Sequence, residues 1–558
     1  MNDKVFNRFF YISLAVLAVI YCLGITLDLM DVDAATYALL SKQMFQSGNY
    51  LQLYLNGKDY LDKPPLLFWL VCLSYKIFGI HDWAYRLPSF LCWALGIYST
   101  YRYVKLFYTE RAAKMAALIM ASCMASYAMT TDVRTDTMLT GWVMFSLWQL
   151  AEFNLTLKFK NILLGGVGVG LAMMTKGPIG LIIPVTAFSV EFAYKRQWKN
   201  FFRWQYLVAL VVIALVLLPM SYGLYEQFDL HPEKVMYDRT GTSGLGFYYW
   251  TQSFGRITGS SSWNNNPDPF FLYHSFLWSF APWCVFFIPA LYTEIKNKII
   301  NFKKPDTSEA ISVGGFVLIL IFLSRSKYQL PHYTFAIHPL AAVLTAKYLD
   351  ERFSSAIKSR LFSVFYGIHI FLLFIIFAIL FLVVFYIFPA PLFFPLVISL
   401  SFCCFIYLLF FSKFNSFPKV LLITILSFVT LTFILNAYFY PKVLTYQTDS
   451  YITKRLNKVA PDGSKILIYK DYHSFGMQYY SRLPIVEDAD KQTLQPDLVP
   501  GKTFILADTS YVKEIQSINP GISVIGVYYN HSPAKLSWGF LNPHTRILNA
   551  EHDVLMQY

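Results

Sequence analysis

Charged residues are scarce in this chain, and their scarcity excludes most classes of soluble protein. Of the 558 residues, 14% are charged, 56% are hydrophobic and 18% are aromatic, and the mean hydropathy is +0.45. An average soluble domain is about one quarter charged. The composition therefore excludes an ordinary cytosolic enzyme, a disordered chain and a nucleic-acid-binding protein, and we expect no nucleic-acid partner.

Cysteine is also rare, and its spacing does not fit the common metal-binding and redox motifs. The chain has seven cysteines in apolar stretches, without a CxxC pair or a Cys/His cluster: Cys22, Cys72, Cys92, Cys123, Cys284, Cys403 and Cys404. Cysteines in such surroundings usually pack as small buried apolar side chains. We therefore expect neither a metal site nor a cofactor.

Apolar runs long enough to cross a bilayer are the most abundant feature of the sequence. A spanning helix takes about 20 residues, and we count about 13 such runs. They begin near residues 9, 86, 113, 136, 162, 178, 206, 272, 311, 331, 361, 392 and 420. The first run, 9–27, is long enough to remain in the bilayer rather than to act as a cleaved signal peptide. The pattern predicts an α-helical polytopic membrane protein embedded among membrane lipids.

The distribution of basic residues predicts the orientation of this protein. The formal net charge is +13, from 46 Lys and Arg against 33 Asp and Glu, and the Lys and Arg residues cluster in every second loop. Cytoplasmic loops of membrane proteins carry an excess of Lys and Arg. With an odd number of spans, the N-terminus is then cytoplasmic and the C-terminal segment lies on the outer side.

Three segments on the predicted outer side interrupt the apolar pattern: a first loop at 28–85, a second loop at 225–271 and a tail at 441–558. The first loop has helical spacing at 34–45 and an apolar run at 65–80, which is short for a span and indicates a re-entrant or interfacial helix. We therefore expect a membrane domain at 1–440 with outer juxtamembrane helices, followed by a periplasmic soluble domain at 441–558.

The tail has the alternating pattern of a small α/β domain. Strands are predicted at 465–469, 503–507, 522–529 and 536–541, and helices at 475–481 and 510–515. The tail contains no cysteine, so this domain is expected to fold without disulfides on the outer side.

Placing ionisable side chains at the level of a membrane costs free energy, so their presence there indicates a structural or functional role. This chain carries five groups of them at predicted outer turns: Asp28, Asp31 and Asp33; Asp62 and Lys63, which precede Pro64 and Pro65; Asp132, Arg134 and Asp136; Lys176 in a tight turn; and Arg325 with Lys327. Three of these groups also have a structural interpretation, as a helix cap at Asp33, a surface ion pair at Lys63 or a network joining helix ends at Arg134.

Taken together, the five groups favour a site for a substrate that has a phosphate at the outer leaflet and a lipid tail. Four cations are available to neutralise phosphate oxygens, namely Lys63, Lys176, Arg325 and Lys327. Three aromatic residues near them, Tyr60, Trp69 and Tyr333, are suited to stacking against a sugar.

In order and spacing these motifs resemble the bacterial GT-C membrane glycosyltransferases, which are similar to protein O-mannosyltransferases and aminoarabinose lipid A transferases. The acid-Lys-Pro-Pro motif at 62–65 is the most specific element. The motifs that carry the resemblance are Asp33 with Tyr37; Tyr60 with Asp62, Lys63, Pro64 and Pro65; Arg134 with Asp136; Lys176 with Gly177 and Pro178; and Lys327 with Leu330, Pro331 and Tyr333.

The resemblance implies the GT-C fold in a bacterial inner membrane, with a polyprenyl-phosphate sugar donor, undecaprenyl-linked, and a lipid A-like or protein acceptor on the periplasmic face. It implies that Asp33 and Asp136 are catalytic and that Asp62 and Lys63 lie at the donor phosphate. The remaining residues that it assigns to substrate binding are Tyr37, Tyr60, Arg256 and Tyr333. The first-loop motif has Ala34 and Thr36 where aminoarabinose transferases usually have an acid and an arginine, so the choice between acceptors stays open.

The expected mechanism is a single inverting displacement. The acceptor attacks the anomeric carbon and polyprenyl phosphate leaves, with Asp33 as base for a hydroxyl acceptor and with Lys63, Arg325 or Lys327 stabilising the leaving phosphate without a metal. A transporter or flippase of lipid-linked sugars and a non-catalytic assembly subunit are the alternatives. A transporter predicts charges near the bilayer midplane and broken helices, whereas most ionisable residues here fall at predicted helix ends.

Overall fold

The computed structural model describes residues 3–30, 32–255, 263–305, 308–354, 360–412, 416–470, 474–533 and 535–558 of the chain. Its residues form two compact units. The helical unit comprises Met1–Ile25, Gln43–Phe377 and Leu400–Thr432, and the mixed unit comprises Thr26–Lys42, Ala378–Ser399 and Phe433–Tyr558.

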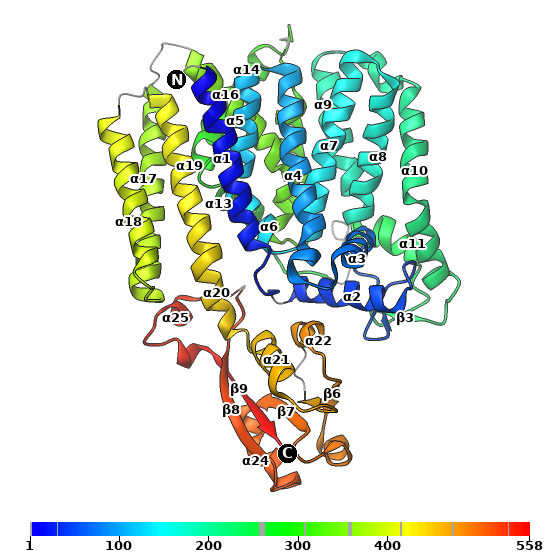
Figure 1. Ribbon diagram of the computed structural model, residues 1–558. Coiled ribbons are helices and arrows are strands. Elements are labelled where there is room, and N and C mark those ends of the chain that lie inside the picture. Colours follow the sequence, from blue (N-terminus) through cyan, green and yellow to red (C-terminus); the bar gives the residue numbers. More distant parts are fainter. Residues whose placement is uncertain are drawn as a thin grey trace. The chain divides into compact units, whose positions relative to one another are not determined.

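The helical unit consists of long helices that run side by side (Figure 1). Its helices in chain order are α1 (Asp3–Gly24), α3 (Leu66–Phe78), α4 (Asp82–Phe107), α5 (Glu110–Ala121), α6 (Met124–Thr131), α7 (Thr135–Thr156), α8 (Phe159–Lys176), α9 (Ile179–Tyr194), α10 (Gln205–Leu224), α11 (Gly244–Gly246), α13 (Phe271–Ser279), α14 (Cys284–Ile300), α15 (Ile311–Leu323), α16 (His338–Ser354), most of α17 (Arg360–Leu382) and most of α19 (Ser416–Ile434). Two short hairpins, β1 (Tyr54–Leu55) with β2 (Lys58–Asp59) and β3 (Val235–Met236) with β4 (Arg239–Thr240), lie in the first and second loops.

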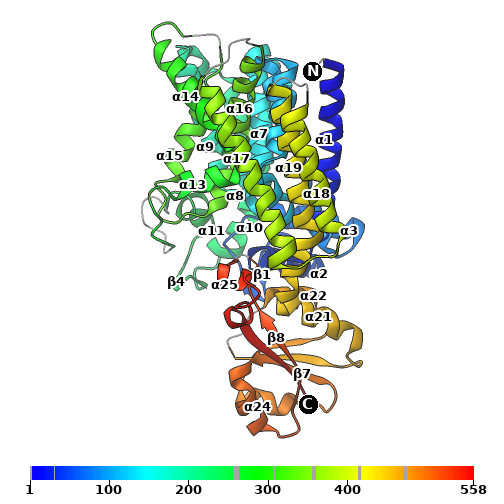
Figure 2. The same cartoon turned by 90° about the vertical axis from the view of Figure 1, so that its left-hand side faces the viewer.

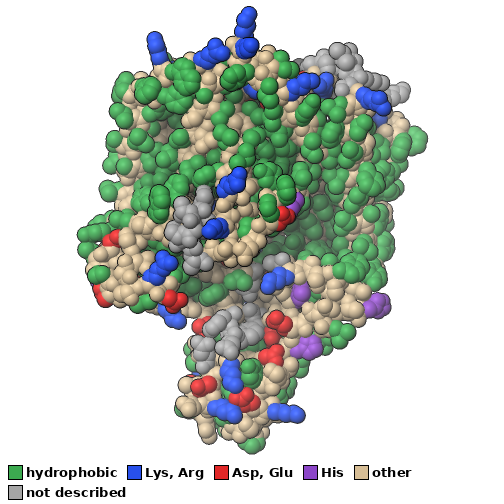
Figure 3. Space-filling view, turned by 180° about the vertical axis from the view of Figure 1, so that it is seen from behind, with side chains coloured by type: hydrophobic (Ala, Val, Ile, Leu, Met, Phe, Trp, Pro, Cys, Tyr) green, Lys and Arg blue, Asp and Glu red, His purple; other side chains and the backbone are tan. Residues whose placement is uncertain are grey.

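Several of these helices have the length and composition of membrane spans. Within the described ranges, five helical stretches qualify: Lys4–Gly24, Gln205–Asp229, Arg360–Ile387, Phe393–Phe411 and Lys419–Tyr446. Two bent pairs raise the number to seven if each pair is one span. Figure 3 shows a broad belt of hydrophobic side chains with Lys and Arg side chains along one edge. The prediction of a multi-pass helical membrane protein is confirmed at this level, and the number of about 13 spans stays a prediction.

The two bent pairs meet at their bends. Helices α5 and α6 are bent by 56°, and α13 and α14 by 119°. The amide N–H of Met124 donates to the carbonyl oxygen of Ala281 at 3.0 Å, and the buried Trp283 indole donates to the carbonyl oxygen of Ser122 at 3.0 Å. Non-helical backbone at membrane depth requires partners within the protein, and here each bend supplies partners for the other.

Helices α4 and α7 approach each other closely because α7 carries glycine at their contact. A Cβ built on Gly141 of α7 would lie 2.2 Å from the carbonyl oxygen of Cys92 in α4. Small residues at helix contacts allow backbones to pack in membrane proteins. The approach matters for function because α7 carries Asp136 in its first turn.

Substitution of Gly141 by alanine is expected to destabilise the helical unit, by about 1–3 kcal/mol for overpacking. The matched control is Gly367→Ala in α17, where a built Cβ has no atom within 4 Å and where alanine improves helix propensity. Thermal unfolding of both variants in the same detergent measures the difference. Equal melting temperatures for Gly141→Ala and the wild type would contradict the close approach.

The first loop contains the predicted short helices. Helix α2 (Asp33–Ser47) covers the predicted helix at 34–45, and α3 (Leu66–Phe78) falls within the apolar run at 65–80. At 13 residues α3 is too short to be counted among the spans. Its assignment as a re-entrant or interfacial segment stays a prediction.

A five-stranded mixed sheet forms the centre of the mixed unit (Figure 2). The strands are β5 (Lys465–Tyr469), β6 (Ile485–Ala489), β7 (Thr503–Asp508), β8 (Ser523–Asn530) and β9 (Glu551–Gln557), in the order β6-β5-β7-β9-β8. Strand β5 pairs in parallel with β6 and β7, and β9 pairs antiparallel with β7 and β8.

Alternation along the strands gives this sheet two packed faces. One face carries Leu467 and Ile505 and packs on Ile515 of α24 (Val512–Ile518). The other face carries Ile466 and packs on Ile452 of α21 (Thr448–Val459) and on Met477 of α22 (Phe475–Tyr480). The other helices of the unit are α18 (Phe393–Ile406, of which residues 393–399 belong here), α20 (Tyr440–Val443), α23 (Lys491–Leu494) and α25 (Trp538–Leu541).

The structure confirms most of the elements predicted in the tail and corrects one. The strands predicted at 465–469, 503–507 and 522–529 are β5, β7 and β8. The strand predicted at 536–541 is wrong, because Trp538–Leu541 is the short helix α25, in which the Ser537 hydroxyl accepts the Phe540 N–H at 3.3 Å as an N-cap. Strands β6 and β9 were not predicted.

An acid-sensitive contact joins β5 to α24 in the mixed unit. The Lys470 ammonium and the Tyr469 hydroxyl both donate to the Glu514 carboxylate at 2.9 Å and lower its pKa. A depressed carboxyl pKa stabilises the folded state above the unfolded pKa of about 4.3 and loses this contribution as the pH falls through the folded value.

We therefore expect Glu514→Gln to lower the protection of β5 and β7 amides at about pH 6, and the difference from wild type to shrink below about pH 4. Hydrogen exchange followed by mass spectrometry, with variant and wild type compared at the same pH, measures this. A difference that does not depend on pH would argue against the ionised contact.

All seven cysteines are free thiols. Cys22 on α1 and Cys403 and Cys404 on α18 are exposed, whereas Cys72, Cys92 and Cys123 are buried and Cys284 is half-buried. The expectation of small buried side chains is therefore confirmed for Cys72, Cys92 and Cys123 and is wrong for the three exposed cysteines.

Candidate functional site

The first charged pair of the candidate site lies immediately before α3. The Lys63 ammonium is 2.7 Å from the Asp62 carboxylate, and the two side chains are 20% and 25% exposed. Pro65 occupies the N-cap position of α3, and its side chain forms no capping hydrogen bond. The Gln252 side-chain amide, from the second loop, donates to the carbonyl oxygen of Asp62 and, at 3.2 Å, to its carboxylate. Asp62 is therefore held both by its neighbour and by the second loop.

The second charged group is a buried cluster around Asp136. Asp136 lies in the first turn of α7 and is 2% exposed. The Lys176 ammonium, at the last residue of α8, is 2.5 Å from one carboxylate oxygen, and His332 Nε2 is 3.7 Å from the other. The same ammonium lies 4.1 Å from the centre of the Tyr333 ring, within the range of a cation–π interaction. The carboxylate and the ammonium thus compensate each other at a buried position.

Local sequence explains why Lys176 ends its helix at this point. Gly177 has φ of +87°, a conformation that favours glycine and stops α8, and Pro178 starts α9. The Ser253 hydroxyl lies 3.2 Å from the position of a Cβ on Gly177, and the Tyr248 hydroxyl donates to the carbonyl oxygen of Met173 at 2.5 Å. The second loop therefore packs directly on the turn that carries Lys176.

The two charged groups are linked by consecutive residues of the second loop. Gln252 bonds Asp62, and Ser253 contacts the Gly177 turn next to Lys176. Because consecutive Cα atoms are about 3.8 Å apart, one short segment bridges the Asp62–Lys63 pair and the end of α8. This segment follows the π-helical turn Phe247–Thr251. Gln252 is a positioning residue that sequence analysis missed, because no motif surrounds it.

The third predicted group divides into separate pairs. Arg134 bonds Asp132 at 2.8 Å, and both side chains are 24% exposed. Asp136, two residues later, belongs to the Lys176 cluster instead. The interpretation of Arg134 as part of a network at helix ends agrees with this geometry.

Arg325 and Lys327 lie exposed in the turn after α15. The backbone of this turn is held by the buried Gln329, whose side chain donates to the carbonyl oxygens of Ser324 and Ser326, both at 3.0 Å. Asn265 of the second loop also pairs with the Gln329 backbone, at 2.8 and 3.1 Å. Within the described ranges, neither cation forms an ion pair.

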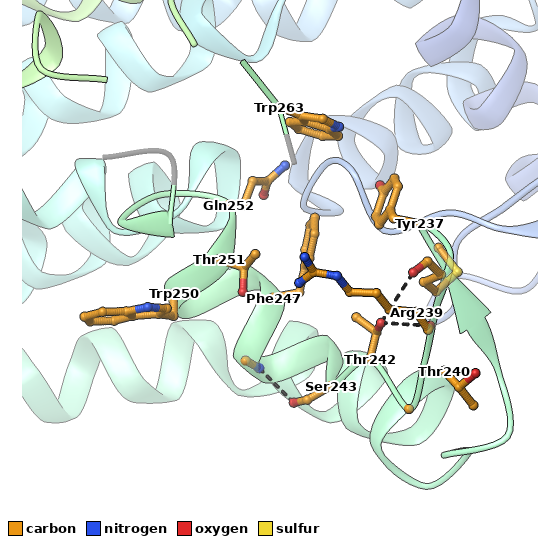
Figure 4. Close-up of a pocket in the computed structure, with 13 residues that line it drawn as sticks. Tyr237, Arg239, Thr240, Thr242, Ser243, Phe247, Trp250, Thr251, Gln252 and Trp263 are labelled. Atoms are coloured by element: carbon orange, nitrogen blue, oxygen red, sulfur yellow. Dashed lines mark hydrogen bonds between the residues drawn. The ribbon is translucent and has the colours of Figure 1, made fainter. Parts of the chain in front are cut away.

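A cavity of about 390 Å³ opens within the second loop (Figure 4). Figure 4 shows the Arg239 side chain reaching across it towards Phe247 and Thr251. Gln252 also lines this cavity, so it adjoins the residue that holds Asp62. Arg239 is a second candidate residue that sequence analysis missed, since the loop around it carries no recognisable motif. The predicted residue Arg256 lies outside the described residues.

The remaining predicted residues are distributed over both units. In the helical unit, Tyr60 is half-buried, and its ring centre is 6.3 Å from that of Phe68. In the mixed unit, Asp33 is the half-buried first residue of α2, and Tyr37 is buried one turn later. The structure therefore brings together Asp62 with Lys63, and Asp136 with Lys176 and Tyr333, and it assigns Asp33 and Tyr37 to the other unit. The catalytic and binding roles of these residues stay predictions.

No group of three or more His, Cys, Asp or Glu side chains within the described ranges is arranged to hold a metal ion. The polar groups of the site are paired as carboxylates with ammonium groups, and ammonium groups also form strong hydrogen bonds to phosphate oxygens.

Comparison with known proteins supports the same family as the motifs. Residues 62–222 match the family described as dolichyl-phosphate-mannose-protein mannosyltransferase. An undecaprenyl phosphate-alpha-4-amino-4-deoxy-L-arabinose arabinosyl transferase of Erwinia tasmaniensis is 25% identical over 320 residues, 56% of this chain and 54% of that protein. A second such transferase, from Pseudomonas fluorescens, is 26% identical over 332 residues, 57% of this chain and 54% of its own length. The match thus spans about half the length of these curated relatives.

The fold has a counterpart among solved structures. The crystal structure of ArnT from Cupriavidus metallidurans bound to undecaprenyl phosphate has a TM-score of 0.72 to this chain at 17% sequence identity, and the alignment covers 98% of this chain and 97% of ArnT. The resemblance predicted from the motifs is confirmed. Over residues 62–222 the chain is similar to the family described as dolichyl-phosphate-mannose-protein mannosyltransferase, and over nearly its whole length it has the fold of ArnT.

Proposed function

We propose that this protein transfers a sugar from a polyprenyl-phosphate donor, with undecaprenyl phosphate as the carrier, to a lipid A-like acceptor. The observation that carries the proposal is the geometry of the two Asp–Lys pairs. Lys63 and Lys176 are both held by carboxylates, and the consecutive residues Gln252 and Ser253 connect their surroundings. Two ammonium groups supported in this way suit the two negative charges of a leaving phosphate.

In the proposed reaction, an acceptor oxygen forms a bond to the anomeric carbon while the bond from that carbon to the phosphate oxygen breaks. The electron pair of the broken bond stays on polyprenyl phosphate, whose developing charge Lys63 stabilises. A hydroxyl acceptor gives its proton to Asp33, whereas a phosphate acceptor is already ionised. Arg325 and Lys327 are the two further cations assigned to the donor phosphate, and Tyr37, Tyr60, Asp62, Arg256 and Tyr333 are the residues assigned to the substrates.

Asp136 has a different role in this proposal from that of Asp33. Its carboxylate is 2% exposed and is 2.5 Å from Lys176. A carboxylate in this state is suited to holding the Lys176 ammonium in position rather than to removing a proton from a substrate. We therefore propose that Asp136 contributes to catalysis through the position of Lys176.

The relatives support the choice of acceptor. The curated transferases are named for the transfer of aminoarabinose from undecaprenyl phosphate, which favours a lipid A-like acceptor. The family description names a protein mannosyltransferase, which makes a protein acceptor the second candidate. We propose a bacterial inner membrane, about 13 spans, a cytoplasmic N-terminus and a periplasmic domain at 441–558.

A transporter of lipid-linked sugars is less favoured by the geometry of the bends. Broken helices of transporters line the substrate site with free backbone groups. Here the groups freed at the two bends bond to each other, as between Met124 and Ala281.

The test is an assay of covalent transfer with the purified full-length protein. Undecaprenyl phosphate-linked aminoarabinose is supplied with lipid A in one reaction and with a Ser/Thr-rich peptide in another, and mass spectrometry measures the mass added to each acceptor. We expect the sugar mass on lipid A. Addition to the peptide alone would support the protein acceptor. Movement of the donor across the membrane of sealed vesicles, without a covalent product on either acceptor, would contradict the proposal that this protein is an enzyme.

A further inference from the structure

A second cavity, of about 590 Å³, lies at the opposite ends of the helices that carry the candidate site. It is lined by Asn154 and Leu155 near the end of α7 and by residues that follow α9. Along α7, the distance from Asp136 to Leu155 is about 28 Å at 1.5 Å per residue. The hydrocarbon core of a bilayer is about 30 Å thick. This cavity and the candidate site are therefore separated along α7 by about the thickness of the hydrocarbon core.

Cations dominate the lining of this cavity. It contains four basic residues and one acidic residue, so the formal charge of its lining is 4 − 1 = +3: Lys195, Arg196, Lys199, Arg203 and Glu191. The Glu191 carboxylate is already satisfied, by the Lys195 ammonium at 2.7 Å and by the N–H of Ala310 at 2.6 Å.

Two of these cations are available to an external anion. The Arg203 guanidinium donates to Asn154 at 3.0 Å, which ties it to the end of α7. Arg196 and Lys199 are exposed, and neither side chain contacts another charged or polar group within the described ranges. The cavity therefore presents two uncompensated positive charges beside a fixed guanidinium.

The residues next to the cavity have the character of a membrane interface. Trp198, which also lines the cavity, is 59% exposed, Phe202 is 87% exposed and Trp204 is 61% exposed. Tryptophan is enriched where membrane proteins meet the headgroup region, and exposed apolar rings beside basic residues are typical of segments that lie in this region. Exposed rings beside Arg196 and Lys199 therefore favour a lipid headgroup over a soluble anion as the ligand of these cations.

We propose that this cavity binds the headgroup of an anionic phospholipid, with the phosphate at Arg196 and Lys199 and the acyl chains along Trp198 and Phe202. The proposal goes beyond the proposed function, because the donor phosphate is assigned to the other end of α7. Basic pockets between transmembrane helices bind anionic headgroups in this way.

The experiment is native mass spectrometry of the full-length protein with added dioleoyl phosphatidylglycerol or dioleoyl phosphatidylcholine, which have the same acyl chains. The wild type is expected to retain phosphatidylglycerol in preference to phosphatidylcholine. The double variant Arg196→Asn/Lys199→Gln is expected to lose affinity for phosphatidylglycerol by about 25-fold, from about fivefold for each cation. Asparagine is chosen because Arg196 has φ of +55°, which asparagine tolerates.

The matched control is Lys158→Gln/Lys160→Gln, which removes the same charge from exposed residues at the N-cap and in the first turn of α8, outside the cavity. It is expected to bind phosphatidylglycerol like the wild type, as is Lys199→Arg. An equal loss of phosphatidylglycerol binding in the control would mean that the lipid is attracted by the overall positive charge of this surface, and it would contradict a specific site in the cavity. Equal retention of both lipids would overturn it too, as would displacement of phosphatidylglycerol by millimolar inorganic phosphate.

Discussion

Replacement of Lys63 by alanine is expected to lower the rate of sugar transfer by about 100- to 1,000-fold, the effect of removing one group that stabilises transition-state charge. The protein is expected to fold, because Asp62 is 25% exposed and its carboxylate stays hydrated when the ammonium is lost. Transfer of aminoarabinose to lipid A, measured as initial rates at saturating donor, gives the effect on the chemical step.

The control for this variant is Lys58→Ala. Lys58 is an exposed lysine of β2 in the same loop, so its replacement removes the same charge without touching the Asp62–Lys63 pair. Lys58→Ala is expected to transfer at the wild-type rate. Near-normal turnover of Lys63→Ala would remove this lysine from the donor site, and an equal loss in both variants would mean that only the net charge of the loop matters.

The second large effect is expected at the buried pair of Asp136 and Lys176. Asp136→Ala leaves the Lys176 ammonium, 20% exposed, without its carboxylate. Removing one partner of a buried ion pair costs about 3–5 kcal/mol. We therefore expect a lower melting temperature, a lower yield of folded protein and loss of transfer, measured by thermal unfolding in detergent and by the transfer assay.

A neutral double variant separates the structural from the catalytic role of this pair. Asp136→Asn/Lys176→Met keeps the approximate shapes of both side chains and removes both charges together, which is often neutral for stability. The double variant is expected to recover most of the lost stability but not the activity. Recovery of activity together with stability would mean that the pair only supports the fold.

The helices of this fold could be predicted from the sequence, whereas the number of spans could not. Each apolar run near the predicted starts contains a helix, because apolar side chains and internally satisfied backbone groups are required in a bilayer. Helix α9 has 16 residues and α15 has 13. Helices this short do not establish by length alone whether they cross a membrane.

In the tail, buried strands were easier to predict than polar or alternating ones. β5 and β7 are apolar along nearly their whole length and were predicted from that pattern. β9 contains Glu551, His552 and Asp553, and it forms a central strand only because β7 and β8 pair on either side. The error at 536–541 arose because Leu536, Trp538 and Phe540 alternate like a strand, whereas the cap at Ser537 favours a helical turn.

The contacts of the site differ in whether they could be predicted from the sequence. Lys63 follows Asp62 directly, so their contact is local. Asp136 and Lys176 are 40 residues apart, but α7 and α8 are consecutive helices joined by a short turn, which brings the start of one beside the end of the other. His332 and Gln252 reach the same groups from distant segments, and their positions depend on tertiary packing that no motif records.

The location of the free thiols makes the sidedness of this membrane protein accessible to chemical labelling. Cys22, Cys403 and Cys404 are the exposed cysteines, and they lie on helical stretches that qualify as membrane spans. Maleimides react with the thiolate, a form that is disfavoured in hydrocarbon. The native cysteines on these stretches are therefore expected to react little with maleimide. A single cysteine introduced at Lys58 or Lys158 would then be the main labelled residue, and membrane-impermeant maleimide applied to intact cells would show which of the two loops faces outward.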